Sequence, residues 1–229
     1  MLEARRRVAA LSGPEWTLAL NQTAAHGRRG RVWIMPKGNF AATLALPVQG
    51  GPTQAALRSF TAALALHDTL ADLTGRPAAL GLKWPNDVLL NGGKIAGILL
   101  ETLPRSGWLA IGIGVNLAEA PEARTLEPEA AAPVSLRGET GLSVTPQDFL
   151  DLLAAALVRW EERLVGEGFA PVRDAFLLRA TRLGEQITAR LPTETLVGTF
   201  DTIDDTGQLV LRTSQGKRLI PAADIYFQG

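Results

Sequence analysis

The stretch KWPNDVLLNGGKIAGILLE, residues 83–101, decides the fold. Its two apolar runs, 88–90 and 95–100, are separated by Asn91-Gly92-Gly93. Residues of this kind adopt the positive φ angles that a tight hairpin connection needs. The stretch therefore predicts two antiparallel strands joined by a short turn.

Charged side chains bracket this apolar hairpin. Lys83, Asp87 and Lys94 flank the strands, and Asn86 precedes the carboxylate. An unpaired charge in an apolar setting is costly. An anionic ligand with a divalent cation would satisfy all of these groups, with the carboxylate on the metal and the lysines on the anion. Any one lysine fits a solvated surface position equally well, but the cluster favours an anion and metal site.

The composition is that of a globular protein. Of its 229 residues 46% are hydrophobic and 20% charged, which suits one sizeable core with room for a small appendage. Lys+Arg and Asp+Glu number 23 each, so a formal net charge of zero gives no general attraction to nucleic acid or membranes. The absence of Cys excludes disulfides and a cysteine nucleophile. A charged amino terminus and no apolar run of membrane length predict a cytoplasmic protein.

Hydrophobic periodicity predicts the elements of a main α+β domain with a mixed sheet and flanking helices. The expected strands are 16–20, 40–47 and 108–117, and the expected helices are 2–11, 52–73, 145–165 and 169–180. His67 falls on the apolar face of the second helix, where a satisfied core or edge histidine is far more frequent than a ligand. Thr145 caps the third helix, with Pro146 at its first position.

The chain changes character after Gly184. Short strands are expected at 186–191, 196–203, 208–212 and 218–220, with turns between them. Strands so closely spaced suggest a small β-barrel appended to the main domain. The last residues, 224–229, suit either a closing strand or the remnant of a protease tag.

Two further segments carry glycines where a ligand could approach the backbone. Residues 22–33, QTAAHGRRGRVW, form a loop with three arginines, and arginine grips phosphate or carboxylate with two hydrogen bonds. A nucleic-acid patch or a mobile surface loop would look similar, but the zero net charge favours a small anion. Residues 111–116, IGIGVN, end a strand and place the Asn116 amide at that end. They are not a dinucleotide fingerprint, because no glycine-rich helix start follows.

Together these segments resemble the biotin–protein ligase family. The loop is similar to the family's Gln-Thr…Gly-Arg-Gly-Arg-x-Gly-Arg-x-Trp signature, 83–87 to its Lys-Trp-Pro-Asn-Asp, 93–99 to its Lys-x-Ala-Gly-Ile-Leu, and 111–116 to its Gly-Ile-Gly-x-Asn. The likeness covers essentially the whole chain. There are two departures. Ala25-His26 stands where the family usually has Gly-Arg, and Met1 lies near the end of the position of the family's Ser-Thr-Asn triplet.

The resemblance implies a fold and a reaction. It implies a class II synthetase-like catalytic domain at 1–182 and a small SH3-like β-barrel at 183–229. Biotin's carboxylate would attack the α-phosphate of ATP, and a carrier lysine would then attack the resulting biotinyl-5′-AMP. The implied cofactors are ATP, biotin and Mg²⁺. Neither step needs an enzyme nucleophile, so catalysis would rest on charge neutralisation and alignment.

The resemblance also implies roles for particular residues. Arg28 and Lys94 would hold the biotin carboxylate and the α-phosphate, Lys83 would face the phosphates, and Asp87 would hold Mg²⁺. Gln22 and the backbone around His26-Gly27 would line the biotin pocket, and Arg31, Trp33, Asn86 and Asn116 would serve ATP. The full predicted binding set is Gln22, Thr23, His26, Gly27, Arg28, Arg29, Arg31, Trp33, Asn86, Lys94, Gly97, Gly112, Gly114 and Asn116.

The expected partner is the biotin carboxyl carrier domain of acetyl-CoA carboxylase or a related enzyme. No nucleic acid or membrane partner is expected, and the protein would be a monomer or homodimer. Lipoate–protein ligase shares the two-step logic, but the Gly-Arg loop and Lys-Trp-Pro-Asn-Asp favour biotin. The related octanoyl transferase needs a cysteine. A DNA-binding repressor would need a further amino-terminal domain, and only the helix at 2–11 precedes the first strand. A non-catalytic biotin binder stays open, and biotin-dependent pyrophosphate release would exclude it.

The position of Arg28 between Gly27 and Arg29 suggests that it clasps the phosphate of the reactive adenylate. Such a charge-assisted contact is worth about 1.5–3 kcal/mol, or roughly ten- to a hundredfold in affinity. Arg28→Gly should therefore still activate biotin but release the adenylate, which labels lysines of bystander proteins. Incubation with biotin, ATP and an unrelated lysine-rich protein, followed by a biotin blot, tests this. Labelling no greater than wild type would identify Arg28 as a solvated surface arginine.

Overall fold

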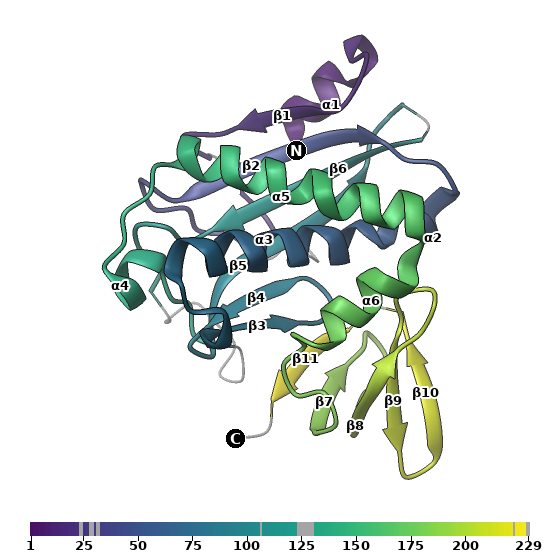
Figure 1. The fold of residues 1–229 in the computed structure, drawn as a ribbon. Helices are drawn as coiled ribbons and strands as arrows, with labels where there is room; N and C mark the ends of the chain where they lie inside the picture. The colour runs from purple at the N-terminus through teal and green to yellow at the C-terminus, as the bar shows by residue number, and fades with distance from the viewer. Residues whose placement is uncertain are drawn as a thin grey trace.

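Two antiparallel sheets and a pair of long helices dominate the fold (Figure 1). The computed structural model describes residues 1–22, 25–27, 30, 33–105, 107–122, 131–221 and 223–227. The first sheet has the strand order β1-β2-β6-β5-β4-β3, and the second has the order β10-β9-β8-β7-β11. Among the described residues, parallel pairing is limited to two isolated bridges, Leu82 with Ala180 and Lys94 with Pro133. The predicted α+β class is confirmed, with less parallel pairing than a mixed sheet suggests.

The elements have the following bounds. The first sheet contains β1 (Glu15–Leu18), β2 (Phe40–Pro47), β3 (Leu80–Lys83), β4 (Asp87–Leu90), β5 (Gly93–Thr102) and β6 (Trp108–Val115). The helices are α1 (Leu2–Arg7), α2 (Gly51–Ala56), α3 (Arg58–Thr74), α4 (Leu136–Thr140), α5 (Pro146–Glu167) and α6 (Phe169–Leu177), with 3-10 turns at Val8–Ala10 and Pro77–Ala79. The second sheet contains β7 (Gln186–Arg190), β8 (Thr195–Ile203), β9 (Leu209–Thr213), β10 (Gly216–Ile220) and β11 (Asp224–Phe227).

The predicted hairpin is β4 and β5. Asn91 and Gly92 form its turn with φ angles of 50° and 80°, as a tight hairpin connection requires. The neighbouring strand β3 pairs with β4 and sets Lys83 opposite Asp87. The sequence pattern does not predict β3, because its few residues are too short a run to show an alternation.

Strand β6 shows how the first sheet divides its two faces. Ile111, Ile113 and Val115 are buried in the main core, which α3 and α5 complete on one side of the sheet (Figure 1). Because side chains alternate along a strand, Gly112 and Gly114 belong to the opposite face. That face is covered at one end by α1, whose Ala4 packs in a smaller cluster with Trp108 and Ala110. The rest of the face is available for a site.

The helices follow the predicted periodicity closely. The Thr145 hydroxyl accepts a hydrogen bond from the Asp148 backbone N–H at 3.1 Å, which confirms the predicted cap of α5. The helix expected at 52–73 is divided at Leu57 into α2 and α3. His67 is buried on α3 with its Nδ1 3.4 Å from Asp68 Oδ1, so the prediction of a satisfied core histidine is confirmed. Among the described residues, no helix has both the length and the apolar character needed to cross a bilayer.

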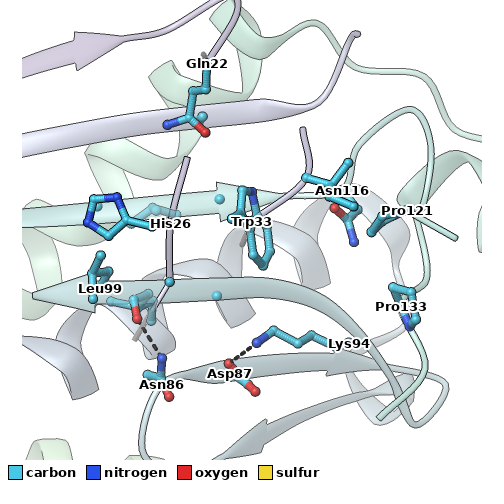
Figure 2. Close-up of a pocket in the computed structure, with 18 of the residues that line it drawn as sticks. Gln22, His26, Trp33, Asn86, Asp87, Lys94, Leu99, Asn116, Pro121 and Pro133 are labelled. Atoms are coloured by element: carbon cyan, nitrogen blue, oxygen red, sulfur yellow. Dashed lines mark hydrogen bonds and ion pairs between the residues drawn. The ribbon is translucent and has the colours of Figure 1, made fainter. Parts of the chain in front are cut away.

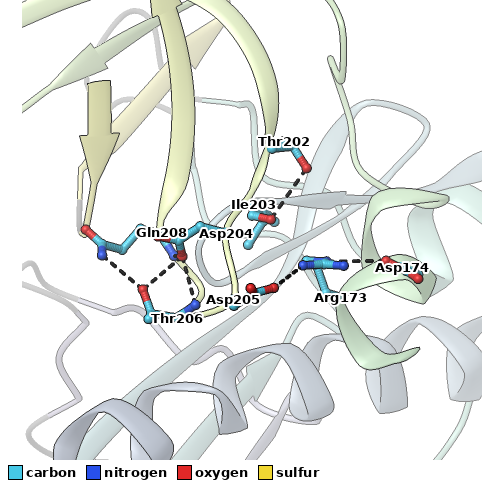
Figure 3. A network of polar contacts seen from close by, with 8 residues as sticks. All are labelled: Arg173, Asp174, Thr202, Ile203, Asp204, Asp205, Thr206 and Gln208. Atoms are coloured by element: carbon cyan, nitrogen blue, oxygen red, sulfur yellow. Dashed lines mark hydrogen bonds and ion pairs between the residues drawn. The ribbon is translucent and has the colours of Figure 1, made fainter. Parts of the chain in front are cut away.

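The second sheet is attached to the helices through the turn between β8 and β9. Figure 3 shows Arg173 of α6 paired with Asp205 at the tip of this turn. The Asp204 carboxylate holds the turn itself, because it accepts hydrogen bonds from the backbone N–H groups of Thr206 (2.9 Å) and Gln208 (2.8 Å). The turn is therefore held by its own hydrogen bonds, and Asp205 at its tip contacts α6.

The second sheet also contacts the first sheet and closes with the carboxy-terminal segment. Trp84 Nε1 donates to the Gly207 carbonyl at 3.2 Å. Ile225 and Tyr226 are buried in β11, which pairs with β7, so residues 224–227 are a closing strand of the sheet. Among the described strands β10 and β11 form the two edges. Closure as an SH3-like barrel and the domain boundary at 182/183 stay predictions.

The core between sheet and helices gives a stability prediction. Phe149 of α5 is fully buried and packs edge-on against Phe40, with ring centroids 5.0 Å apart. Phe149→Ala should lower the free energy of unfolding by about 3–5 kcal/mol, because it removes buried contacts and leaves a cavity. Leu152→Ala on the same helix is the control, since Leu152 is 46% exposed, and should change it by less than about 0.5 kcal/mol. Equal effects in denaturant titrations would contradict this assignment of the core face.

Candidate active site

A cavity of about 230 Å³ opens on the face of the first sheet away from α3 and α5. Its floor is formed where adjacent strands carry small side chains or none. One row across the sheet is Ala41, Gly114 and Gly97, and the next is Thr43, Gly112 and Leu99. The glycines leave room above β5 and β6, and the side chains of Trp33 and Met1 use part of it. The strand register therefore makes the hollow.

Trp33 lies on this glycine floor (Figure 2). A Cβ atom on Gly114 would be only 2.7 Å from Cζ2 of the indole, and one on Gly97 would be 3.4 Å from Cζ3. The indole therefore uses the space that a side chain at position 114 would fill. Lys94 Nζ is 5.7 Å from the centre of the ring, within the range of a cation–π contact.

An ion pair marks the polar end of the cavity. Lys94 Nζ lies 2.6 Å from Asp87 Oδ1, and the two side chains are 29% and 17% exposed (Figure 2). This Oδ1 is buried and accepts no hydrogen bond of normal geometry from the described residues, so its contact with Lys94 is ionic. Lys94 is the one lysine or arginine among the described residues that line the cavity.

The backbone of Lys94 is fixed by the segment beside it. Its N–H donates to the Ala132 carbonyl at 2.7 Å, and its carbonyl accepts from the Val134 N–H at 3.0 Å. A Cβ on Gly93 would lie 2.3 Å from Val134, so this close approach depends on glycine. The Lys94 side chain therefore extends from a part of β5 whose backbone is held by hydrogen bonds on both sides of the residue.

Two predicted asparagines line the cavity but use their amides within the protein. Asn86 Nδ2 donates to the Ile98 carbonyl at 2.7 Å (Figure 2), and Asn116 Nδ2 donates to the Val134 carbonyl at 3.0 Å. Asn116 is buried, and its Oδ1 faces Asn39 Nδ2 at 3.4 Å. Both therefore support the walls, and a direct contact of either with ATP stays a prediction.

The other end of the cavity is bounded by His26 and the amino-terminal residue. His26 Nε2 lies 3.1 Å from Glu101 Oε1, and the Met1 ammonium donates to Thr43 Oγ1 at 2.8 Å. Burial lowers the pKa of that ammonium, and the nearby Glu101 carboxylate opposes the shift. Burial alone would raise the pKa of Glu101, but hydrogen bonds from His26 and Arg5 outweigh it, and the net shift is downward.

Most of the predicted residues that the structure describes meet in this cavity. Those lining it are Gln22, His26, Gly27, Trp33, Asn86, Asp87, Lys94, Gly97, Gly112, Gly114 and Asn116. Lys83 is buried opposite Asp87 on β3 and is not among the lining residues, so its predicted role at the phosphates has no support from this position. Thr23, Arg28, Arg29 and Arg31 lie outside the described residues.

Other lining residues were missed by sequence reasoning. Met1, Thr43, Pro133 and Asp224 contribute to the walls. The alternation of β2 could have indicated Thr43, because it lies on the same face as Ala41. Nothing local distinguishes Asp224, which reaches the cavity only because β11 of the second sheet lies beside the first.

Comparisons with known proteins agree with this geometry. The model of the biotin/lipoate A/B protein ligase family matches residues 1–117, and that of the biotin protein ligase C terminal domain matches residues 183–228. The chain is 55% identical to a biotin–[acetyl-CoA-carboxylase] ligase of Paracoccus denitrificans over 99% of this chain and 96% of that protein. This chain belongs to the biotin protein ligase family. The identification agrees with the resemblance that the motifs show.

Other relatives in the biotin protein ligase family are more distant. A biotin–[acetyl-CoA-carboxylase] ligase of Mycobacterium tuberculosis is 32% identical over 91% of this chain and 77% of that protein. The solved structure of the biotin protein ligase from Aquifex aeolicus in complex with biotin and ATP matches with a TM-score of 0.80, covering 97% of this chain and 93% of that chain. Its identity is 21%, so this likeness shows a shared fold.

The contact of Trp33 with the glycine floor is testable. Gly114→Ala puts a methyl group where the indole lies, so the ring should be displaced. Gly97→Ala is the matched control, because its methyl group would stand at 3.4 Å and needs only a small adjustment. The readout is the Trp33 indole N–H resonance in ¹⁵N spectra, assigned with Trp33→Phe among the five tryptophans. A resonance that shifts no more in Gly114→Ala than in Gly97→Ala would contradict this placement of the ring.

Proposed function

We propose a division of roles in the cavity of this ATP-dependent biotin–protein ligase. In the first step the biotin carboxylate attacks the α-phosphorus of ATP, which gives biotinyl-5′-AMP and pyrophosphate. In the second step a lysine amine of the acceptor attacks the carbonyl of that mixed anhydride and releases AMP. The observation that carries the assignment is the single cavity lysine, Lys94, at the junction of an apolar floor and a carboxylate.

Biotin would occupy the apolar half of the cavity. Ala41 and Leu99 offer apolar surface there, and the Met1 side chain lies over Gly112. Gln22 supplies an amide that can hydrogen-bond the polar ring of biotin. This orientation directs the carboxylate of biotin along the floor toward Lys94.

Lys94 would offset the repulsion between two approaching anions. The biotin carboxylate and the α-phosphate are both negative, and their approach is unfavourable without a nearby cation. A preorganised positive charge stabilises the transition state more than the separated reactants. We expect Lys94 to turn from Asp87 toward these anions, because the α-phosphate and the biotin carboxylate together attract the ammonium more strongly than one carboxylate does, and because Asp87 gains another cation as its partner. The ion pair is therefore an arrangement that substrates replace.

Asp87 would then be available to Mg²⁺. Among the described residues there is no group of three or more His, Asp or Glu side chains that could enclose a metal. One buried carboxylate still fits Mg²⁺, which keeps several waters and is commonly shared with substrate phosphates. The buried Asp87 Oδ1, which accepts no hydrogen bond from the described residues, is the donor atom of choice. When bound there, the cation would supply charge neutralisation at the pyrophosphate leaving group.

ATP would enter at the end of the cavity that holds Trp33 and Pro133. The indole offers a planar surface for the adenine base, and stacking of this kind is common in nucleotide sites. The roles of Arg28 at the biotin carboxylate and α-phosphate, and of Arg31 at ATP, stay predictions. Asp224 places the second sheet at the same opening, so the acceptor would meet both domains there.

We infer that the acceptor is the biotin carboxyl carrier domain of acetyl-CoA carboxylase or a related carboxylase. The name of the Paracoccus denitrificans relative supports this choice. The composition and the absence of cysteine are compatible with a cytoplasmic reaction between the two proteins.

Lys94→Ala should abolish biotin-dependent pyrophosphate release, with a loss of about a hundredfold or more in rate, because it removes the charge that both substrates need. Lys37→Ala removes the same charge from an exposed turn outside the cavity and should leave the rate unchanged. Circular dichroism spectra of both variants should match wild type. A Lys94→Ala variant with near-wild-type release would refute the role, and a wild-type protein that binds biotin without releasing pyrophosphate would be a binder, not an enzyme.

A further inference from the structure

Two described residues of the Gly-Arg loop (residues 22–33), His26 and Trp33, contact the first sheet. The base of the loop is closed by a hydrogen bond from the Trp33 N–H to the Ala25 carbonyl at 3.3 Å. From this base Trp33 lies over Gly97. His26, next to Ala25, instead contacts Glu101. Both contacts are therefore made with strand β5.

The two contacts lie on one face of β5 at opposite ends of the cavity. Gly97, Leu99 and Glu101 point the same way because side chains alternate along a strand, and Gly97 and Glu101 are about 13 Å apart at 3.3 Å per residue. Figure 2 shows His26 above Leu99 and Trp33 farther along the same strand. His26 and Trp33 thus lie against different parts of the cavity floor.

Glu101 sits between the loop and helix α1. Its Oε1 faces His26 Nε2 at 3.1 Å, and its Oε2 accepts from Arg5 Nη2 at 3.0 Å. The carboxylate is 21% exposed, whereas His26 and Arg5 are each more than 40% exposed. The two oxygens of the Glu101 carboxylate therefore contact different segments. One contacts His26 in the Gly-Arg loop, and the other contacts Arg5 in α1, which does not line the cavity.

We propose that Glu101 is a positioning residue for biotin binding, which holds the His26-Gly27 backbone against the apolar end of the cavity. The proposal rests on the proposed function of that site. His26 and Gly27 line the cavity, and Glu101 does not. Glu101 therefore acts through His26. A loop fixed before the ligand arrives loses less conformational freedom on binding, so the contact strengthens biotin binding without joining the chemistry.

The Glu101 carboxylate is charged at neutral pH, because the net shift of its pKa is downward. A charged acceptor makes a stronger hydrogen bond with the imidazole than a neutral one would. The other charged groups around the contact come from the amino-terminal segment: Arg5, Glu3 and the Met1 ammonium.

The experiment measures the Kd of biotin alone by calorimetry at neutral pH in full-length variants. His26→Ala and Glu101→Gln should each weaken binding about tenfold, as expected for a lost charge-assisted contact. The double variant should be no weaker than either single one, because both remove the same interaction. His26→Arg should bind as wild type, because its guanidinium can donate to the Glu101 carboxylate in place of the imidazole. His26 is exposed, so His26→Ala tests the contact even if Glu101→Gln disturbs folding.

Arg5→Ala is the matched control, since it removes the other partner of Glu101 and leaves His26 in place. It should change the Kd less than twofold. A Kd unchanged in His26→Ala, single-variant effects that multiply in the double variant, or an Arg5→Ala effect equal to that of Glu101→Gln would each overturn the proposal. Biotin-dependent pyrophosphate release by wild type is measured alongside. Its absence would instead refute the proposed function.

Discussion

The pairing register of β5 and β6 is the constraint on which the site depends. It sets Gly97 beside Gly114 and Leu99 beside Gly112, so glycine occupies three of these four positions on one face. A shift of one strand by one residue would turn its isoleucine, Ile98 in β5 or Ile113 in β6, into the cavity and its glycines into the core. Burial of those isoleucines under α3 and α5 prevents the shift, so the hydrophobic core on one face maintains the ligand floor on the other.

The same strand places the charged groups at the two ends of this floor. Lys94 stands near the start of β5 beside Asp87, and Glu101 stands near its end beside His26. Each acidic group is held by a basic one of the same site. When the substrate anions bind, they can take the place of Asp87 beside Lys94. The half-buried ammonium of Lys94 therefore keeps a negative partner throughout. The Gly-Arg loop connects both ends through His26 and Trp33.

Much of this could be predicted from sequence because it depends on local patterns. The turn at Asn91-Gly92, the cap at Thr145 and the alternation of β6 each follow from a few adjacent residues. Strand β3, the contribution of Asp224 and the burial of Lys83 could not be predicted this way, because each depends on contacts between distant segments. The motifs likewise indicated Asn86 and Asn116 as ligand residues, but did not show that their amides are used by the carbonyls of Ile98 and Val134. A family motif can show that a residue lies in the site, but it does not show which hydrogen bonds the atoms of that residue make.

A crystal structure of the protein with biotinyl-5′-AMP would test the central claim most directly. The adenylate should lie in the cavity against the Trp33 indole, with Lys94 Nζ turned from Asp87 to within hydrogen-bond distance of the phosphate. The His26–Glu101 contact should persist in that complex. An adenylate bound outside this cavity, or bound in it with the Lys94–Asp87 ion pair intact, would contradict the account.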